Sequence, residues 1–304
     1  ARTLAQHVER LGFTRMWVAE HHNFPAVTTA ATSLVIGHLA AGTTTLRVGA
    51  GGIMLPNHAP YVIAEQFGTL DALFPGRIDL GLGRAPGTDQ PTLAALRRDP
   101  RSAEYFPDDV RELQAFLAPA RPGQRIEAVP GSGANVPLWI LGSSLFGAQL
   151  AAELGLPFGF ASHFAPQQLD EALALYRHRF KPSETREKPY ALVGVNVIAA
   201  ETDEEARRLA TTQQMSFAGI LRRERGLAKP PIDDIDRYWT PAEKFQAQAM
   251  LSFSVIGSLE TVRRGLAERI ERTKADELMV VSDVYDFEQR LRSVELIKRA
   301  VESL

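Results

Sequence analysis

The stretch that decides the fold is residues 46–83, LRVGAGGIMLPNHAPYVIAEQFGTLDALFPGRIDLGLG. It begins with a short apolar run, continues with apolar residues at helical spacing, and ends in a second apolar run after Pro75-Gly76. Short apolar runs without polar alternation predict strands that are covered on both faces. A helix between two such strands predicts a parallel pair, so this stretch is expected to form a β-α-β unit.

The same alternation of strand and helix extends in both directions along the chain. The expected strands are residues 15–21, 46–55, 77–83, 136–142, 158–164, 190–200 and 276–284. The chain opens in a helical segment, residues 1–13, with no strand pattern before it. Seven strands separated by helices predict an α/β (β/α)8 TIM barrel whose first strand is missing from this chain. An open doubly wound sheet is the alternative.

Two longer segments interrupt the regular pattern. Residues 84–133 are mostly polar and contain one clear helix, at 107–118. Residues 203–253 are rich in helix and follow what would be the seventh strand of a full barrel, so we expect an insertion there. Its middle, residues 223–241, is expected to be a mobile loop. No linker divides the chain, and we therefore expect a single domain over residues 1–304.

Composition excludes several classes of protein. The formal net charge of −2 gives no basic footprint for nucleic acid or for an anionic membrane surface. The absence of cysteine excludes disulfides, zinc–thiolate sites and thiol nucleophiles. No apolar run approaches the roughly 18 residues that cross a membrane, and the first residues lack a signal-peptide pattern. We expect a cytoplasmic protein that binds neither nucleic acid nor membranes.

Polar and glycine-rich residues follow the apolar strand bodies. They occupy positions 20–23, 51–52, 81–84, 142–144, 162–164 and 282–283. The active site of a TIM barrel lies at the carboxyl ends of its strands, so these residues are the candidates for a site. Glycines inside a strand, as at Gly51-Gly52, predict a β-bulge or a close approach of the backbone to a ligand, with simple packing as the alternative.

The sequence Glu20-His21-His22-Asn23 brings two histidines to a strand end. Neighbouring strand residues point to opposite faces, so the two histidines do not readily share a metal ion. No HxH or HExxH spacing occurs either, and we expect no metal site. We interpret His21 as a catalytic base or hydrogen-bond donor, with a histidine satisfied by backbone as the alternative. Glu20 and His163 are weaker candidates for the wall of a substrate pocket.

Arg84 and the pair Ser143-Ser144 predict an anion site. Arg84 can pair with a phosphate in a forked contact, although a structural salt bridge explains it equally well. The serines precede a helix whose free N–H groups can bind an anion, whereas such serines also act as N-caps. Because they end consecutive strands of the predicted barrel, all three can converge on one phosphate. The segment GLGRAPG lacks GxGxxG spacing, and Pro86 follows instead of a helix, which argues against a dinucleotide loop.

The chain resembles the bacterial-luciferase-like monooxygenases. The resemblance is carried by MWVAEHHN (residues 16–23), by residues 47–90, by GSSLFGAQLAAELGLPFGFASHF (142–164) and by VIGSLETVRRGL (255–266). It covers nearly the whole chain and is nearest to uncharacterised single-chain bacterial members. It implies a (β/α)8 barrel that binds reduced FMN, usually a diffusible substrate delivered by a separate NAD(P)H:flavin reductase, and commonly a homodimer.

The resemblance also assigns roles to individual residues. His21 matches the active-site histidine near the flavin, and Gly51-Gly52 matches a position that often has a non-proline cis peptide beneath the isoalloxazine ring. Arg84 and Ser144 match phosphate-binding positions, with Gly142 and Ser143 beside them. The excursion after residues 190–200 matches the mobile active-site lid. Two departures are Gly83, where light-emitting members have a reactive cysteine, and Gly147, where some members have a hydroxyl near the phosphate.

The activity implied is a monooxygenase reaction. Reduced FMN and O₂ would form a C4a-hydroperoxide that passes one oxygen atom to a small organic substrate, in a pocket closed against water. His21 would manage the proton on the peroxide or the substrate. The alternatives are a flavin- or deazaflavin (F420)-dependent dehydrogenase on the same barrel, a non-catalytic flavin-binding protein and, more distantly, a metal-dependent barrel hydrolase.

Overall fold

The computed structural model describes residues 1–85, 87–224 and 226–304, so Pro86 and Arg225 lie outside the described part. Pro86, used above as an argument against a dinucleotide loop, and one position of the loop expected at 223–241 are therefore outside the described residues. The described residues form two compact units, Ala1–Leu141 and Gly142–Leu304. The single domain expected over residues 1–304 stays a prediction.

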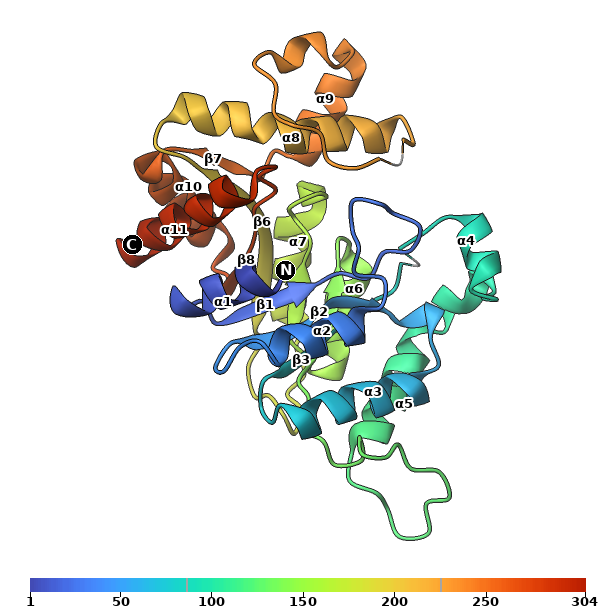
Figure 1. Cartoon of the computed structure of the whole chain (residues 1–304). Helices are drawn as coiled ribbons and strands as arrows, with labels where there is room; N and C mark the ends of the chain where they lie inside the picture. The colour runs from blue at the N-terminus through green and yellow to red at the C-terminus, as the bar shows by residue number, and fades with distance from the viewer. Residues whose placement is uncertain (86, 225) are drawn as a thin grey trace. The chain divides into compact units, whose positions relative to one another are not determined.

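The first unit is built on parallel strands in chain order. Its strands are β1 (Arg15–Val18), β2 (Arg47–Met54), β3 (Ile78–Gly83) and β4, which spans Leu138–Gly142 and pairs with β3 through Leu138–Leu141. Its helices are α1 (Arg2–Arg10), α2 (Thr32–Ala40), α3 (Pro60–Leu73), α4 (Gln90–Ala95) and α5 (Phe106–Leu117). Figure 1 shows α2 and α3 beside these strands. The short α4 and the 3-10 turn at Pro100–Glu104 were not expected from the polar sequence.

The β-α-β unit expected at residues 46–83 is confirmed. Strands β2 and β3 pair in parallel from Val48↔Ile78 to Met54↔Gly83, and the register shifts between Gly51 and Ile53. An irregular register at these glycines is what the bulge interpretation predicts. Between the two strands, α3 begins at Pro60, whose fixed φ and missing N–H suit the first turn of a helix.

A buried carboxylate ties the first three strands together. The side chain of Asp79 on β3 has no exposed surface and accepts hydrogen bonds from Arg15 and Arg47, and from Trp17 Nε1 at 3.1 Å. A Cβ at Gly49 would lie 2.6 Å from the Asp79 Cβ, so glycine makes the room that this network needs. The partners of Asp79 come from β1 and β2, and the network therefore fixes how these strands align.

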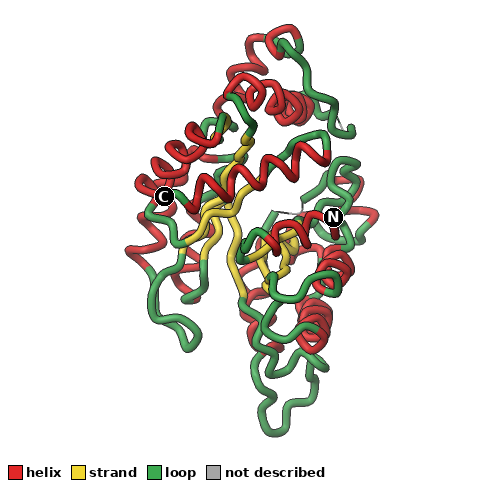
Figure 2. Tube along the Cα trace, turned by 60° about the vertical axis from the view of Figure 1, so that its left-hand side comes forward, coloured by secondary structure: helices red, strands yellow, loops and turns green. Residues whose placement is uncertain are grey.

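The second unit is arranged around one long strand, β6 (Ala191–Ala199), as Figure 2 shows in yellow. Parallel neighbours are β5 (Phe158–Phe160) and β8 (Glu277–Val281), while β7 (Val255–Gly257) pairs with the last three residues of β6. The helices of this unit are α6 (Leu145–Leu154), α7 (Leu169–Arg179), α8 (Asp203–Leu221), α9 (Pro241–Met250), α10 (Leu259–Thr273) and α11 (Phe287–Glu302).

The insertion after β6 has more structure than the sequence predicted. It contains α8, a 3-10 turn at Ile235–Arg237 and α9, and is followed by β7, which lies just beyond the helix-rich segment expected at 203–253 and was not predicted. Three residues are too few to show a strand period, which is why β7 was missed. The segment between α8 and α9 is tied to α8, because Thr212 Oγ1 donates to the Lys229 carbonyl at 2.9 Å and the Ile232 N–H donates to Thr211. A small apolar cluster of Phe217, Trp239 and Ala247 packs inside it.

No helix among the described residues is both long enough and apolar enough to cross a membrane.

The Asp79 network predicts a large effect on stability. In Asp79→Ala the guanidinium groups of Arg15 and Arg47, which are only 11% and 25% exposed, lose their counter-charge. We expect the free energy of unfolding to fall by about 3–5 kcal/mol in urea denaturation. The matched control is Asp108→Ala, which removes an exposed ion pair with Arg111 and should change the free energy far less. Equal effects of the two substitutions would contradict this account.

Candidate functional site

The carboxyl end of β2 carries a bare stretch of backbone. The peptide bond between Gly51 and Gly52 is cis, the geometry that the family resemblance associates with this position. A Cβ at Gly52 would lie 2.5 Å from the Gly81 carbonyl oxygen and 2.8 Å from Leu141 Cδ1, and a Cβ at Gly83 would lie 2.9 Å from Met54 Sδ. A side chain at Gly52 would collide with the main chain of Gly81, whereas at Gly83 it would meet only the end of the Met54 side chain.

Next to this backbone lies a fully buried carboxylate, that of Glu20. It accepts hydrogen bonds from the Met54 N–H at 2.9 Å, from Asn57 Nδ2 at 3.1 Å, and from the Nε2 atoms of His22 and His58 at 2.9 Å each. An ionised carboxylate offers about four acceptor positions, and these donors occupy them. The Glu20 carboxylate therefore fixes the position of its neighbours, and its predicted place in the wall of a substrate pocket stays a prediction.

Glu20 binds β2 at two points just after the cis peptide. Its backbone N–H donates to the Gly52 carbonyl oxygen at 3.2 Å, while its carboxylate accepts from the N–H of Met54, two residues further along β2. The bulged strand end is thus bonded to the chain that follows β1. The sequence analysis did not single out Asn57 or His58, because no local pattern links them to Glu20.

The pKa of Glu20 reflects a competition between burial and hydrogen bonding. Burial alone raises the pKa of a carboxyl group, but the hydrogen bond and positive charge of His58, together with Asn57 and the Met54 N–H, outweigh it. The pKa of Glu20 is consequently lowered from its ordinary value of 4.5. The carboxylate stays ionised at neutral pH even though it has no contact with solvent.

His21 stands apart from this network. Its Nδ1 lies 3.4 Å from the Gly87 carbonyl oxygen, and its ring centroid is 6.0 Å from that of Phe24. The two adjacent histidines take different partners, as alternating side-chain directions predict, because only His22 contacts Glu20. Among the described residues, no three His, Asp or Glu side chains gather as ligands for a metal ion.

The predicted phosphate ligands lie at strand ends in both units. Arg84 directly follows β3 in an exposed position. In the second unit Ser144 is the N-cap residue of α6, but its side chain makes no capping hydrogen bond, so the first-turn N–H groups of α6 are not satisfied by it. That arrangement favours the anion-site interpretation over a simple N-cap. Convergence of Arg84 and the serines on one phosphate stays a prediction.

The departure at Gly147 has a packing reason. A Cβ at Gly147 would lie 3.3 Å from Phe158 Cε2 and 3.4 Å from the Gly142 Cα. Glycine at position 147 therefore lets the first turn of α6 approach the end of β4 closely. A hydroxyl-bearing side chain would meet the same neighbours.

In the second unit a chain of polar side chains lies at the carboxyl edge of the sheet. Asn196 on β6 and Gln213 on α8 are each 1% exposed and are joined by a hydrogen bond of 2.9 Å from Gln213 Nε2 to Asn196 Oδ1. Asn196 in turn donates to the His163 carbonyl oxygen. Of these three, only His163 was singled out from the sequence. Asn196 could have been noticed in the sequence, because it is the one amide side chain in the otherwise apolar run at residues 190–200.

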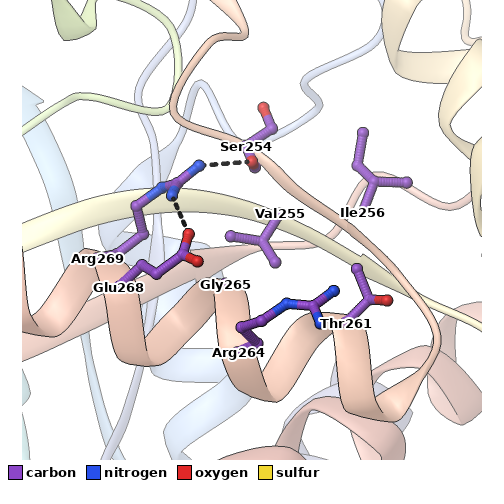
Figure 3. A pocket seen from close by; sticks show the side chains of 8 residues that line it. All are labelled: Ser254, Val255, Ile256, Thr261, Arg264, Gly265, Glu268 and Arg269. Carbon is purple, nitrogen blue, oxygen red and sulfur yellow. Dashed lines mark hydrogen bonds and ion pairs between the residues drawn. The ribbon is translucent and has the colours of Figure 1, made fainter.

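A groove of about 250 Å³ lies between β7 and α10 in the second unit. It is lined by Ser254, Val255, Ile256, Thr261, Arg264, Gly265, Glu268 and Arg269, and Figure 3 shows Arg269 joined to both Glu268 and Ser254. The hydrogen bonds of Arg269 go to the carbonyls of Phe253 and Ser254 and to the Glu268 carboxylate. None of the candidate site residues from the sequence lines this groove.

Known proteins resemble this chain over its full length. Residues 1–277 match a family model described as luciferase-like monooxygenase. A luciferase-like monooxygenase of Escherichia coli (strain K12) is 52% identical over 302 residues, which cover 99% of this chain and 90% of that protein. The crystal structure of apo-MsnO8 is 35% identical with a TM-score of 0.86, covering 99% of this chain and 91% of that one.

Two more distant structures share the fold. The oxygenating constituent of 3,6-diketocamphane monooxygenase from Pseudomonas putida, in complex with FMN, is 19% identical with a TM-score of 0.73, covering 98% of this chain and 90% of that one. An F420-dependent secondary alcohol dehydrogenase with an F420-acetone adduct is 14% identical with a TM-score of 0.72, covering 98% and 93%. The predicted α/β TIM-barrel fold class is confirmed.

Glu20→Gln tests the buried carboxylate. Because the folded state lowers the pKa of Glu20, the stability it contributes is fully present above the unfolded-state value of 4.5 and is lost as pH falls through the folded-state value. Near pH 7 we expect the free energy of unfolding of the variant to be about 2 kcal/mol lower than that of the parent protein. Below about pH 4.5 the difference between the two free energies, called the gap here, should narrow. Urea denaturation across this range measures the gap. The exposed Glu184→Gln is the control, and a gap that widens in acid would refute the assignment.

Proposed function

Because the chain belongs to the luciferase-like monooxygenase family, we propose that it is a flavin-dependent monooxygenase that uses reduced FMN and O₂ to oxygenate a small organic substrate. The observation that supports this most directly is the pair of residues without side chains, Gly51-Gly52, near the carboxyl end of β2, where a flat ring could approach the main chain closely. When bound, the flavin supplies the electrons that activate O₂.

The residues present fit such a cofactor. Gly51 and Gly52 would take the ring, and the uncapped first turn of α6 suits a phosphate group. We assign the phosphate to Arg84, Ser143 and Ser144, with Gly142 beside them, as the sequence predicts. A guanidinium and hydroxyl groups are the donors that bind phosphate in a charge-assisted manner.

The chemistry proposed for the chain itself is proton management and exclusion of water. His21 is the general base or donor, and it is free of the network that immobilises its neighbour His22. We propose that the insertion around residues 220–250 closes over the substrate, which would keep water from the reacting atoms. Glu20 acts as a positioning residue, because its carboxylate binds the N–H of Met54 and so fixes the carboxyl end of β2.

The proposal includes partners that follow from the family resemblance. A separate NAD(P)H:flavin reductase would deliver reduced FMN, because the sequence carries no nicotinamide fingerprint. A homodimer and a cytoplasmic location belong to the same proposal. The competing function is an F420-dependent dehydrogenase, supported by the shared fold of the alcohol dehydrogenase, and a non-catalytic flavin-binding protein is the further alternative.

The test supplies chemically reduced FMN or reduced F420 together with ¹⁸O₂ and a probe, decanal. Oxygenation would convert the aldehyde, reduced FMN and O₂ to decanoic acid, oxidised FMN and water, with one ¹⁸O atom in the acid. We expect labelled acid with reduced FMN only, detected by mass spectrometry. His21→Ala should lower its rate about 100-fold or more, which is the usual contribution of acid–base catalysis, with unchanged FMN affinity.

Other outcomes would separate the alternatives. Turnover of an alcohol or ketone with F420, without need of O₂, would replace the proposal by the dehydrogenase. Tight binding of oxidised FMN with no oxygen consumption on reduction would indicate the non-catalytic protein. Full coupled turnover by His21→Ala would remove the role of His21 while leaving the flavin assignment standing.

The phosphate assignment predicts a selective loss of affinity. Arg84→Ala and Ser144→Ala should each weaken FMN binding about tenfold or more, because each removes a charge-assisted hydrogen bond, and should leave riboflavin binding unchanged. Fluorescence titration measures both ligands. If both side chains contact the same phosphate, the double variant will lose less than the sum of the two single losses. Arg101→Ala, in an exposed ion pair with Asp99, is the control.

A further inference from the structure

In the polar chain at the carboxyl edge of the second unit, one ring nitrogen, His163 Nδ1, has no hydrogen-bond partner among the described residues. We call its residues the amide cluster: they are His163, Asn196, Gln213, Ser254 and Asp283. Asn196 Nδ2 donates to the His163 carbonyl oxygen and to Ser254 Oγ at 3.3 Å, and Gln213 Nε2 donates to Asn196 Oδ1 at 2.9 Å and to Asp283 at 3.3 Å. Both amides thus donate within the cluster, whereas the imidazole of His163 makes no hydrogen bond to the described residues through Nδ1.

The backbone that carries His163 is held from two directions. The buried amide of Asn196 binds its carbonyl oxygen, and the preceding residue, Ser162, donates its hydroxyl to the Gly194 carbonyl oxygen at 2.6 Å. Ser162 and Asn196 are 0% and 1% exposed, respectively. The segment after β5 is therefore fixed against β6, and the His163 side chain starts from a fixed position.

Gly194 determines which edge of the imidazole faces the sheet. A Cβ at Gly194 would meet His163 Nδ1 first, with Cε1 and Cγ next at 3.3 and 3.4 Å. These two atoms flank Nδ1 in the ring, so the Nδ1 edge lies on Gly194 and the opposite Nε2 edge points away from β6. Phe164 packs edge-on against the ring, with centroids 5.0 Å apart.

The buried edge fixes the protonation state of the ring. Among the described residues, Nδ1 of His163 has no hydrogen-bond partner and is closed to solvent. A proton on that atom would be buried without an acceptor, which is costly. Burial accordingly lowers the pKa of His163 to about 4, so at neutral pH the ring is uncharged and carries its proton on Nε2.

We infer that the Nε2–H of His163 is a permanent, uncharged hydrogen-bond donor that recognises a carbonyl oxygen on the organic substrate. This inference rests on the proposed function, since it places an organic substrate at the carboxyl edge of the sheet. The nearest charged member of the amide cluster is the carboxylate of Asp283, which disfavours an anionic ligand. The guanidinium of Arg269 donates to the carbonyls of Phe253 and Ser254 and is paired with the Glu268 carboxylate.

The first measurement is the state of His163 itself, by NMR of ¹⁵N-histidine-labelled protein. The chain has 7 histidines, so His163→Gln assigns the signal by its disappearance. We expect the neutral Nε2–H tautomer throughout about pH 5.5–8.5, because both ends of this range lie well above the pKa of about 4. A ring that protonates within the range, or carries its proton on Nδ1, overturns the inference.

The second measurement compares two probes of the same shape, cyclohexanone and methylenecyclohexane, which differ in having C=O or C=CH₂. Binding is measured without flavin and with saturating oxidised FMN, so the result does not depend on turnover. We expect cyclohexanone to bind about tenfold more tightly and to shift the His163 ¹⁵Nε2 signal, since one satisfied hydrogen bond is worth about this factor. Equal affinities in both conditions, with no shift, would overturn the inference.

Variants separate recognition from structure. His163→Leu should abolish the preference for the ketone, whereas His163→Gln, whose amide N–H can replace Nε2–H, should retain part of it. Gly194→Ala should abolish the preference by displacing the ring, and His178→Leu, on the exposed surface of α7, should leave it unchanged. Retention of the preference in His163→Leu would contradict the proposal. Absence of flavin binding with the preference intact would refute the proposed function alone.

Discussion

The ionised carboxylate of Glu20 is the constraint on which the candidate site depends. A charge without solvent contact persists only where hydrogen bonds replace the lost water, and four donor groups from β2 and the two loops do so. The same residue binds the Gly52 carbonyl oxygen through its backbone. The bare backbone at Gly51-Gly52 therefore sits next to a rigid polar anchor, while His21 projects away from it.

In both units a buried polar side chain and a nearby glycine together fix the position of a strand end. Each needs a strand end that holds its shape while side chains around it carry chemistry. In the first unit Glu20 supplies the anchor and the glycines of β2 and β3 supply room. In the second, Asn196 and Gln213 supply the anchor and Gly194 supplies the room for His163. The two features depend on each other. A buried polar side chain can hold a neighbouring group in place only if a glycine leaves enough room for that group to approach the strand.

The parts of the structure that follow from local patterns could be predicted from the sequence. The β-α-β unit, the bulge at Gly51-Gly52 and the strand ends all follow from apolar runs, helix spacing and glycine positions. The convergence of Glu20 with Asn57 and His58 could not, since it joins residues more than 30 positions apart through side-chain geometry. The strand at Val255–Gly257 was likewise invisible, because three residues carry no period and its partner is the far end of β6.

Glu20 and His163 show that partners, and not burial alone, decide the charge of a buried group. Burial opposes the charged form in both, which raises a carboxyl pKa and lowers an imidazole pKa. Glu20 gains enough donors to reverse that tendency and remains an anion. His163 has Nδ1 against a glycine, no residue in the described part of the chain accepts a proton from it, and the ring remains neutral. The Glu20 carboxylate thus serves to fix the backbone. The His163 imidazole keeps an N–H donor whose protonation does not change near neutral pH.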